Sequence, residues 1–255
     1  MKLSQSKKIY FASDQHFGAP NAATSRKREI HFISWLEAIS QDAQALYLLG
    51  DLFDFWVEYK KAVPKGFVRV LGKLAQMADA GIIIHYFVGN HDLWMKDYFE
   101  TELGIPVHHH PQEVEWNNKT FLLGHGDGLG PGDLGYKRMK KVFTNPLAQI
   151  LFRSLPTRWG LSLGQFFSLK NKLLSGNEVP EFLGNDKEWL VHYCNEQEQE
   201  KQRNYYIFGH RHLPLEILLE KGATYINLGD WVTHCTYAVF DGHTTKLKTW
   251  KPTHD

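Results

Sequence analysis

Short, almost uninterrupted apolar segments alternate with amphipathic ones along the first ninety residues, and this alternation limits the fold more than any other feature. Residues 8–13, 45–49 and 82–88 predict buried strands, and residues 25–40 and 64–80 predict helices between them, with Pro64 in the first turn of the second helix. Strands that are apolar throughout are typical of parallel sheets whose two faces are covered. The pattern therefore indicates an α/β fold.

The second half of the chain predicts shorter strands that pair around turns. Residues 114–116 and 120–123 flank Asn117 and Asn118, which favours a β-hairpin. Further strands are expected at 205–208, 224–227 and 237–240, and Asp241-Gly242 supplies a turn before a last strand. Because no repeat or low-complexity linker divides the sequence, we expect a single domain over residues 1–255 that contains a second sheet.

Residues 134–177 form a basic, apolar segment that contains eight Lys or Arg and no Asp or Glu. The whole chain has a net charge of only +1, so the remainder is acidic. We interpret the segment as a helical insertion, a lid whose cations and large apolar residues suit an anionic lipid. The alternative, a helical lid packed on the core, explains the apolar residues but not the lack of acidic ones.

The sequence also predicts a cytoplasmic protein. Residues 1–8 are polar, and the apolar stretch that follows is too short for the core of a signal peptide. No run approaches the roughly 18 apolar residues of a spanning helix. Cys194 and Cys235 form no C-x-x-C motif, and we interpret them as reduced thiols.

Five short motifs of Gly, Asp, Asn and His follow predicted strands. Side chains at the carboxyl ends of strands in an open α/β sheet converge on ligands, so we expect these motifs to meet at one site. They are Asp14-Gln15-His16, Gly50-Asp51-Leu52-Phe53-Asp54, Gly89-Asn90-His91-Asp92, Gly124-His125-Gly126-Asp127 and Gly209-His210-Arg211-His212.

The donors in these motifs suit a pair of divalent metal ions. One carboxylate can bridge two ions, and each ion then needs nitrogen and oxygen donors that leave a position open for water. A structural zinc site would favour Cys and a closed shell, and these motifs contain no Cys. Seven side chains supply the donors: Asp14, His16, Asp51, Asn90, His125, His210 and His212.

Other polar residues near the motifs receive no metal role. Asp54 is expected to support the loop after Asp51 rather than to bind metal. His108, His109 and His110 follow a Pro-containing segment and are expected to lie in a solvated loop.

The order and spacing of the five motifs resemble the calcineurin-like metallophosphoesterase family, whose pattern is D-x-H, G-D-x-x-D, G-N-H-[D/E], G-H and G-H-x-H. The resemblance runs from Asp14 to His212 and implies an αββα sandwich of two mixed sheets, here with residues 134–177 as the helical lid insertion. It implies that Asp51 bridges two ions. The first ion would also bind Asp14, His16 and His212, and the second Asn90, His125 and His210. Among the expected catalytic residues, which include Asn90, His91 would donate to the leaving oxygen or the phosphate, and Asp92 would orient His91.

Three features resemble the UDP-2,3-diacylglucosamine hydrolases of lipid A biosynthesis: the aromatic pair Phe55-Trp56, the run from His125 through Tyr136 to Asn145-Pro146 and Leu155-Pro156, and the basic insertion. This resemblance implies cleavage of the pyrophosphate to UMP and 2,3-diacylglucosamine 1-phosphate (lipid X), with two Mn²⁺ ions, by a protein peripheral on the cytoplasmic face of the inner membrane. It implies substrate contacts at Asp133, Tyr136, Lys170 and Lys172. His91 departs from the group, whose better-known members have Arg there.

Three alternatives differ in what they require of the sequence. His91 also fits a general metal-dependent phosphodiesterase or phosphatase acting on nucleotides or other phosphoesters. A nuclease would be expected to carry a broad basic face, whereas the cations here are concentrated in one insertion, so no nucleic-acid partner is expected. A metal-free scaffold of this fold would lack several ligands, and none is missing. The expected partners are a lipid-linked nucleotide and an anionic membrane surface; no protein partner is inferred.

Overall fold

A six-stranded mixed sheet forms the first layer of the protein. The computed structural model describes residues 1–59, 61–131, 134–154, 156 and 181–251. Strands β1 to β4 of this sheet are parallel, and β10 and β11 extend it in antiparallel fashion, in the order β11-β10-β1-β2-β3-β4. Their bounds are β1 Lys8–Ala12, β2 Ala43–Leu49, β3 Ile83–Phe87, β4 Val107–His108, β10 Thr236–Phe240 and β11 Thr245–Thr249.

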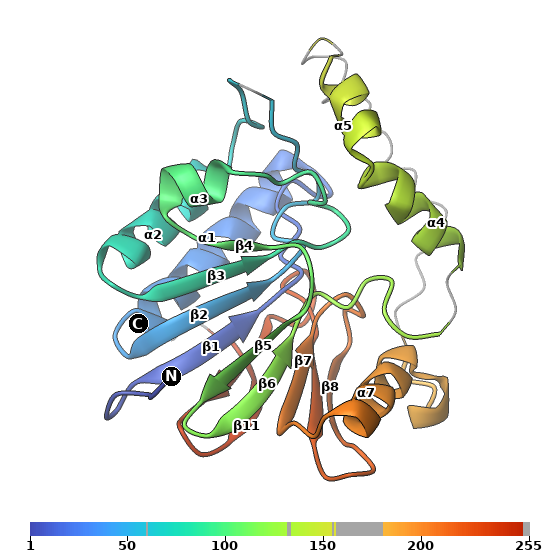
Figure 1. The fold of residues 1–255 in the computed structure, drawn as a ribbon. Coiled ribbons are helices and arrows are strands. Elements are labelled where there is room, and N and C mark those ends of the chain that lie inside the picture. Colours follow the sequence, from blue (N-terminus) through green and yellow to red (C-terminus); the bar gives the residue numbers. More distant parts are fainter. Residues whose placement is uncertain (60, 132–133, 155, 157–180, 252–255) are drawn as a thin grey trace.

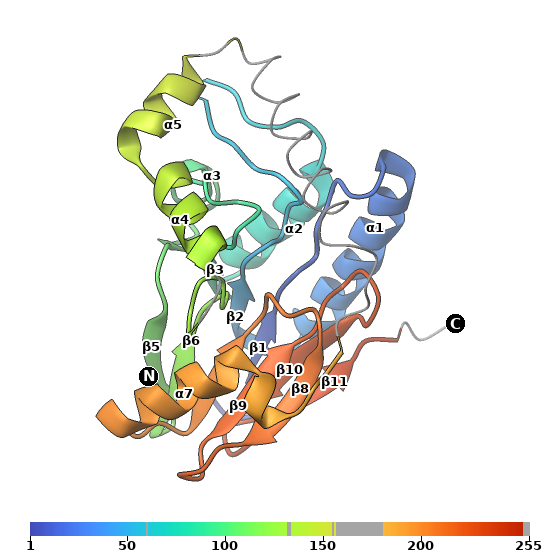
Figure 2. The same cartoon turned by 90° about the vertical axis from the view of Figure 1, so that its right-hand side faces the viewer.

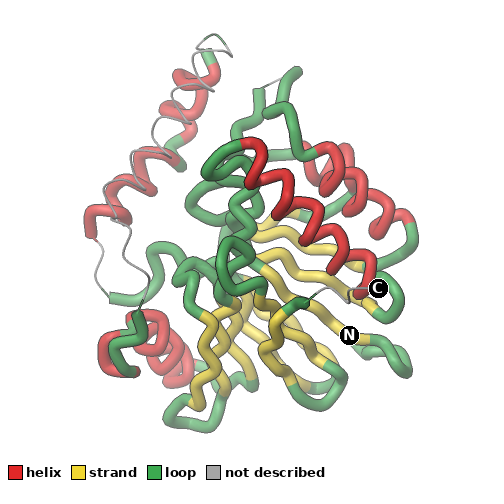
Figure 3. Tube along the Cα trace, turned by 180° about the vertical axis from the view of Figure 1, so that it is seen from behind, coloured by secondary structure: helices red, strands yellow, loops and turns green. Residues whose placement is uncertain are grey.

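Three helices cover one face of this sheet: α1 (Ala22–Ile39), α2 (Val68–Asp79) and α3 (Tyr98–Leu103), which Figure 1 labels. Figure 3 shows the helical side of the sheet from behind the molecule. Asn21 begins α1, because its side chain accepts a hydrogen bond from the Thr24 amide at 3.0 Å. Trp35 and Phe32 of α1 lie in a buried cluster with side chains of β1, β2 and α2. Burial of this aromatic face holds the helices in place.

A second, five-stranded mixed sheet packs on the other face of the first one. Its order is β5-β6-β7-β9-β8, and β5 and β6 form the expected hairpin. Asn117 and Asn118 make the turn with positive φ values of 48° and 61°, a conformation that Asn tolerates well. The bounds are β5 Gln112–Trp116, β6 Lys119–Leu123, β7 Tyr205–Phe208, β8 Pro214–Leu218 and β9 Thr224–Leu228.

The two sheets and their helices make four layers (Figures 1 and 2). Between the sheets, the Phe121 ring packs on Phe11 and Phe240. The short η1 (Asn185–Lys187) leads into α7 (Trp189–Glu200), which covers the outer face of the second sheet through Leu190 and Cys194. This arrangement confirms the predicted αββα sandwich of two mixed sheets.

Helices α4 (Leu134–Phe143) and α5 (Pro146–Arg153) project from the sandwich, and we call them the α4–α5 arm (Figures 1 and 2). Neither helix has a buried residue, and five large apolar side chains are 58% to 71% exposed: Leu134, Val142, Leu147, Ile150 and Leu151. The predicted insertion is thus helical over 134–143 and 146–153; its residues 155 and 157–177 lie outside the described part. In that described part, no helix combines the length and apolarity needed to cross a membrane.

Two local predictions were wrong. Pro64 precedes α2 rather than lying in its first turn, because Gly66 and Phe67 have positive φ values of 112° and 47° that a helix cannot contain. His108 is not in a solvated loop: it forms part of the edge strand β4 and lies 2.9 Å from the His85 ring, Nε2 to Nδ1.

Candidate metal centre

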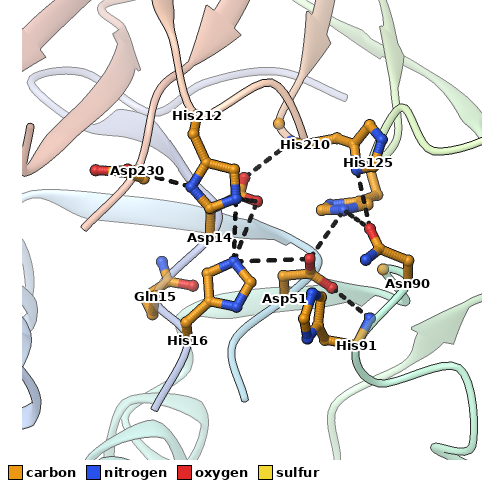
Figure 4. A network of polar contacts seen from close by, with 12 residues as sticks. Asp14, Gln15, His16, Asp51, Asn90, His91, His125, His210, His212 and Asp230 are labelled. Atoms are coloured by element: carbon orange, nitrogen blue, oxygen red, sulfur yellow. Dashed lines mark hydrogen bonds and ion pairs between the residues drawn. The ribbon is translucent and has the colours of Figure 1, made fainter. Parts of the chain in front are cut away.

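The five motifs meet at one edge of the sandwich, where strands of both sheets end. Asp14 and His16 follow β1, Asp51 follows β2, and Asn90 and His91 follow β3 of the first sheet. From the second sheet, His125 follows β6, and His210 and His212 follow β7. Figure 4 shows that the side chains of all seven expected ligands point toward a common centre.

The backbone at five of these residues is left-handed. Asp14, His16, Asp51, His210 and His212 have φ values between 47° and 68°. A residue other than glycine rarely adopts this backbone conformation, which costs of order 1–3 kcal/mol of stability. It persists where the surrounding structure imposes it, typically at functional sites. The loops are therefore shaped to aim side chains, at some cost in stability.

Asp51 lies in the middle of the centre. Its Oδ2 atom is 3.8 Å from His16 Nε2 and 3.3 Å from His125 Nε2, while Oδ1 accepts a hydrogen bond from the His91 amide at 2.9 Å. The carboxylate is buried. Its position between two groups of histidines is the one that a bridging ligand requires.

The first group consists of Asp14, His16 and His212. The Nε2 atoms of the two imidazoles are 3.2 Å apart, and Asp14 Oδ1 lies 3.7 Å from that of His16 and 3.3 Å from that of His212. Within the described ranges, this buried Asp14 oxygen has no hydrogen-bond partner. A buried carboxylate oxygen that faces two imidazole nitrogens fits a divalent cation.

The second group gathers around the Asn90 side-chain oxygen. This oxygen lies 3.1 Å from His125 Nε2 and 2.9 Å from His210 Nδ1. Because the group shares Asp51 with the first one through His125, the two groups together form a double centre of oxygen and nitrogen donors.

Three of the imidazoles are held from behind. The Nδ1 atom of His125 donates to the Leu49 carbonyl at 2.8 Å, that of His212 lies 3.1 Å from Asp230 Oδ2, and that of His16 lies 3.5 Å from Asp54 Oδ1. Each contact leaves Nε2 directed at the centre, which is how metal-binding histidines are usually oriented.

The electrostatics favour a cation. Burial by itself would raise the pKa of Asp14, but His212 and His16 outweigh burial and lower that pKa to about 2. Burial would likewise lower the pKa of His16, but Asp14 and Asp54 raise it to about 9. The buried carboxylates therefore attract positive charge, which a proton or a metal ion can supply.

Asp92 was expected to orient His91, but the two side chains bind other partners. The Asp92 carboxylate accepts hydrogen bonds from the Tyr86 hydroxyl and from the Gly89 amide, so it braces the loop rather than the His91 ring. Burial and the nearby Asp51 raise the pKa of Asp92 to about 7. The Nδ1 atom of His91 instead donates to the Asp54 carbonyl at 2.8 Å.

Comparison with known proteins identifies the family. A UDP-2,3-diacylglucosamine hydrolase of Porphyromonas gingivalis is 40% identical over 254 residues, which covers 94% of this chain and 97% of that one. The chain belongs to the UDP-2,3-diacylglucosamine hydrolase family. A hydrolase of the same name from Ectopseudomonas mendocina is 29% identical over 226 residues, with 88% and 90% of the two chains covered. No family model matches. A solved structure from Thermus thermophilus covers 96% of this chain and 99% of its own, at 13% identity and a TM-score of 0.47.

The structure adds residues to the site of this hydrolase family member that its motifs did not predict. Asp230 orients His212 and accepts hydrogen bonds from the Thr233 and His234 amides. Arg28 of α1 donates to the Gln15 and His16 carbonyls at 3.0 and 2.8 Å. Asp230 had a signal, because Gly229-Asp230 follows β9 as Gly50-Asp51 follows β2, whereas nothing near Arg28 in the sequence marks it.

Of the four expected substrate contacts of this hydrolase family member, only Tyr136 lies in the described part. Its hydroxyl donates to Asp127 at 2.5 Å, and its ring centroid is 6.3 Å from that of His210. Asp133, Lys170 and Lys172 lie outside the described residues.

Gly89→Ala tests how tightly Asp51 is enclosed. A Cβ at Gly89 would lie 2.2 Å from Asp51 Oδ1 and 2.8 Å from the Asp51 amide, so the carboxylate must move. We expect the variant to lose most of its bound divalent metal, measured by elemental analysis after dialysis. The matched control is Gly72→Ala in α2, where a Cβ meets nothing within 4 Å. Equal metal content in the two variants would contradict the central placement of Asp51.

Proposed function

We propose that the protein hydrolyses the pyrophosphate of UDP-2,3-diacylglucosamine to UMP and 2,3-diacylglucosamine 1-phosphate. The observation that carries the proposal is the clustering of Asp and His donors around Asp51 in a chain 40% identical to a hydrolase of that name. Pyrophosphate cleavage needs a water nucleophile and stabilisation of charge on phosphorus, and a pair of divalent ions supplies both.

The ions of this proposal are two Mn²⁺. One ion would be held by Asp14, His16 and His212. The other ion would be held by Asn90, His125 and His210, and Asp51 would bind both ions. The carboxylate and amide oxygens of this donor set suit Mn²⁺, whereas its imidazoles equally suit Fe²⁺, Ni²⁺ and Zn²⁺, so the choice of Mn²⁺ rests on the resemblance to the hydrolase group. Leu49, Asp54 and Asp230 contact the Nδ1 atoms of His125, His16 and His212, which leaves the Nε2 atoms of these three imidazoles available; His210 instead faces Asn90 with Nδ1.

His91 is proposed to act on the phosphate or the leaving oxygen through Nε2. Its Nδ1 proton is bound to the Asp54 carbonyl, so donation from Nε2 needs a second proton. Burial lowers the pKa of His91, and the negative charge of a pyrophosphate beside the ring acts in the opposite direction.

Product analysis tests the proposed reaction. With Mn²⁺ and UDP-2,3-diacylglucosamine, mass spectrometry should detect UMP and 2,3-diacylglucosamine 1-phosphate in equal amounts. Hydrolysis in ¹⁸O water should place the label on the UMP phosphate, because water attacks the α-phosphorus. Turnover of simple phosphodiesters without turnover of this substrate would favour the general phosphodiesterase.

Three substitutions distinguish the metal ligands Asp51 and His212 from the proposed proton donor His91. Asp51→Ala should abolish turnover and lower occupancy of both ions, which lie about 4 Å apart in such centres and would lose their shared charge. His212→Ala should lower occupancy of one ion. His91→Ala should retain both ions and slow turnover by roughly 10²–10⁴-fold, the usual contribution of general acid–base catalysis. Metal content and turnover number are measured for each variant. An Asp51→Ala protein with full metal content would contradict the assignment of Asp51 as the shared ligand.

We also propose that the α4–α5 arm binds the acyl chains and the anionic inner-membrane surface. Its exposed apolar side chains adjoin the exposed cations Arg138 and Lys141, while Lys137 and Lys140 are bound to the loop of His125. Each Lys or Arg near an anionic bilayer contributes about 1 kcal/mol, and each buried CH₂ about 0.8 kcal/mol.

A vesicle assay tests the membrane contact. Replacing Arg138 and Lys141 with Gln should weaken binding to vesicles that contain anionic phospholipid and flatten its dependence on salt. The matched control replaces Lys246 and Lys248, two exposed residues of β11, and changes the net charge equally. If both double variants bind alike, the arm is not the membrane-binding surface.

A further inference from the structure

Hydrogen bonds attach the α4–α5 arm to the sandwich at two places in the described part of the chain, and Arg153 of α5 also lies in the field of Glu58 and Asp97. At the first, the buried Asp127 accepts hydrogen bonds from the Tyr136 hydroxyl and from Lys140, both at 2.5 Å. Lys137 donates to the Gly130 carbonyl. These contacts join Tyr136, Lys137 and Lys140 of α4 to the loop that carries His125.

The second attachment is Trp94, which is 7% exposed. Its indole N–H donates to the carbonyl of Phe143, the last residue of α4, at 2.7 Å. Its ring centroid lies 5.8 Å from that of Phe143 and 4.1 Å from that of Phe152 in α5. A carbonyl at a helix end has no partner within its own helix; Trp94 and the Gln149 side chain, which donates at 3.2 Å, both bind this one, and Trp94 also packs on both helices.

Trp94 belongs to the same loop as the metal-centre residues Asn90 and His91. The His91 carbonyl accepts a hydrogen bond from the Trp56 amide at 3.3 Å, and Trp94 pairs with Val57 in an isolated bridge. The Asp92 carbonyl accepts from the Met95 amide at 2.9 Å. The loop is therefore fixed on its core side and holds the arm on its outer side.

We propose that Trp94 is a positioning residue, which fixes the arm relative to the metal centre and so determines how well an acylated substrate is aligned for hydrolysis. The inference rests on the proposed function, in which the pyrophosphate lies at the centre and the acyl chains at the arm. Because the arm has no buried residue of its own, its position depends on these few attachments. A small phosphodiester has no acyl chain for the arm to align, so its hydrolysis should depend less on the position of the arm.

The test compares Trp94→Ala and Trp94→Phe with the wild type. Trp250→Phe is the matched control, since it removes an indole N–H that donates to Ser34 Oγ at 3.3 Å, outside the arm and the metal centre. Trypsin cleavage after Arg138, Lys141 and Arg153 reports release of the arm without any substrate. Rates on UDP-2,3-diacylglucosamine and on bis(4-nitrophenyl) phosphate, both with Mn²⁺, report alignment.

For Trp94→Ala we expect cleavage of the arm to accelerate about ten-fold, because local opening becomes easier. The kcat/KM for UDP-2,3-diacylglucosamine should fall roughly ten- to a hundred-fold, since a misplacement of about 1 Å can cost that much. Metal content and the rate on the small diester should stay within about two-fold of the wild type. Trp94→Phe, which keeps a ring and loses the N–H, should lie between, and Trp250→Phe should match the wild type.

Two outcomes overturn the proposal: an unchanged rate of arm cleavage, or equal losses on both substrates, which would make Trp94 a support of the Asn90 loop alone. If Trp94→Ala does not fold, Trp94→Phe decides by the same measurements. The proposed function fails separately, if the wild type does not hydrolyse UDP-2,3-diacylglucosamine, and the cleavage rates then still decide whether Trp94 holds the arm.

Discussion

Two carboxylates, those of Asp14 and Asp51, are buried side by side at the edge of the sandwich, and the surrounding structure is arranged around that negative charge. Burial of an unpaired carboxylate costs several kcal/mol, so the charge must be matched. Imidazoles and backbone amides surround the pair, and two glycines give it room. A Cβ at Gly89 or at Gly209 would come within 2.4 Å of a carboxylate oxygen. The left-handed backbone of the loops and the glycines beside the carboxylates thus both follow from the burial of this negative charge.

The constraint extends beyond the ligands to the groups that hold them. Asp230 and the Leu49 carbonyl orient imidazoles, Arg28 binds two carbonyls of the β1 loop, and Asp92 ties Gly89 to Tyr86. None of these groups needs to contact an ion to matter. They limit the rotation of ligands and loops, which keeps the donors in place before a substrate arrives.

The sequence predicted the sheets, the hairpin, the family and the convergence of the five motifs, because strand periodicity and Gly-flanked polar motifs are local signals. Its failures involve contacts with residues outside the local motif. Asp92 was paired with its neighbour His91, but its partner is Tyr86 in the strand before the loop. His108 looked solvated until β4 paired with β3 beside His85. The start of α2 depended on the left-handed Phe67, whose ring packs on Phe53.

The centre draws its donors from both sheets, and this has a consequence for the mechanics of the fold. Asp14 and Asp51 come from the first sheet, and His125, His210 and His212 come from the second. The His210 amide already crosses the gap to Asp14 Oδ2 at 3.0 Å, and His125 crosses it to the Leu49 carbonyl. A divalent ion held between such donors would cross-link the two sheets, as a disulfide links two segments. Unlike a disulfide, this link would be removed by a chelator. Ions that bind only the folded protein add their binding free energy to its stability. Bound metal would therefore add to the apolar packing that already joins the two sheets, besides supplying chemistry at their shared edge.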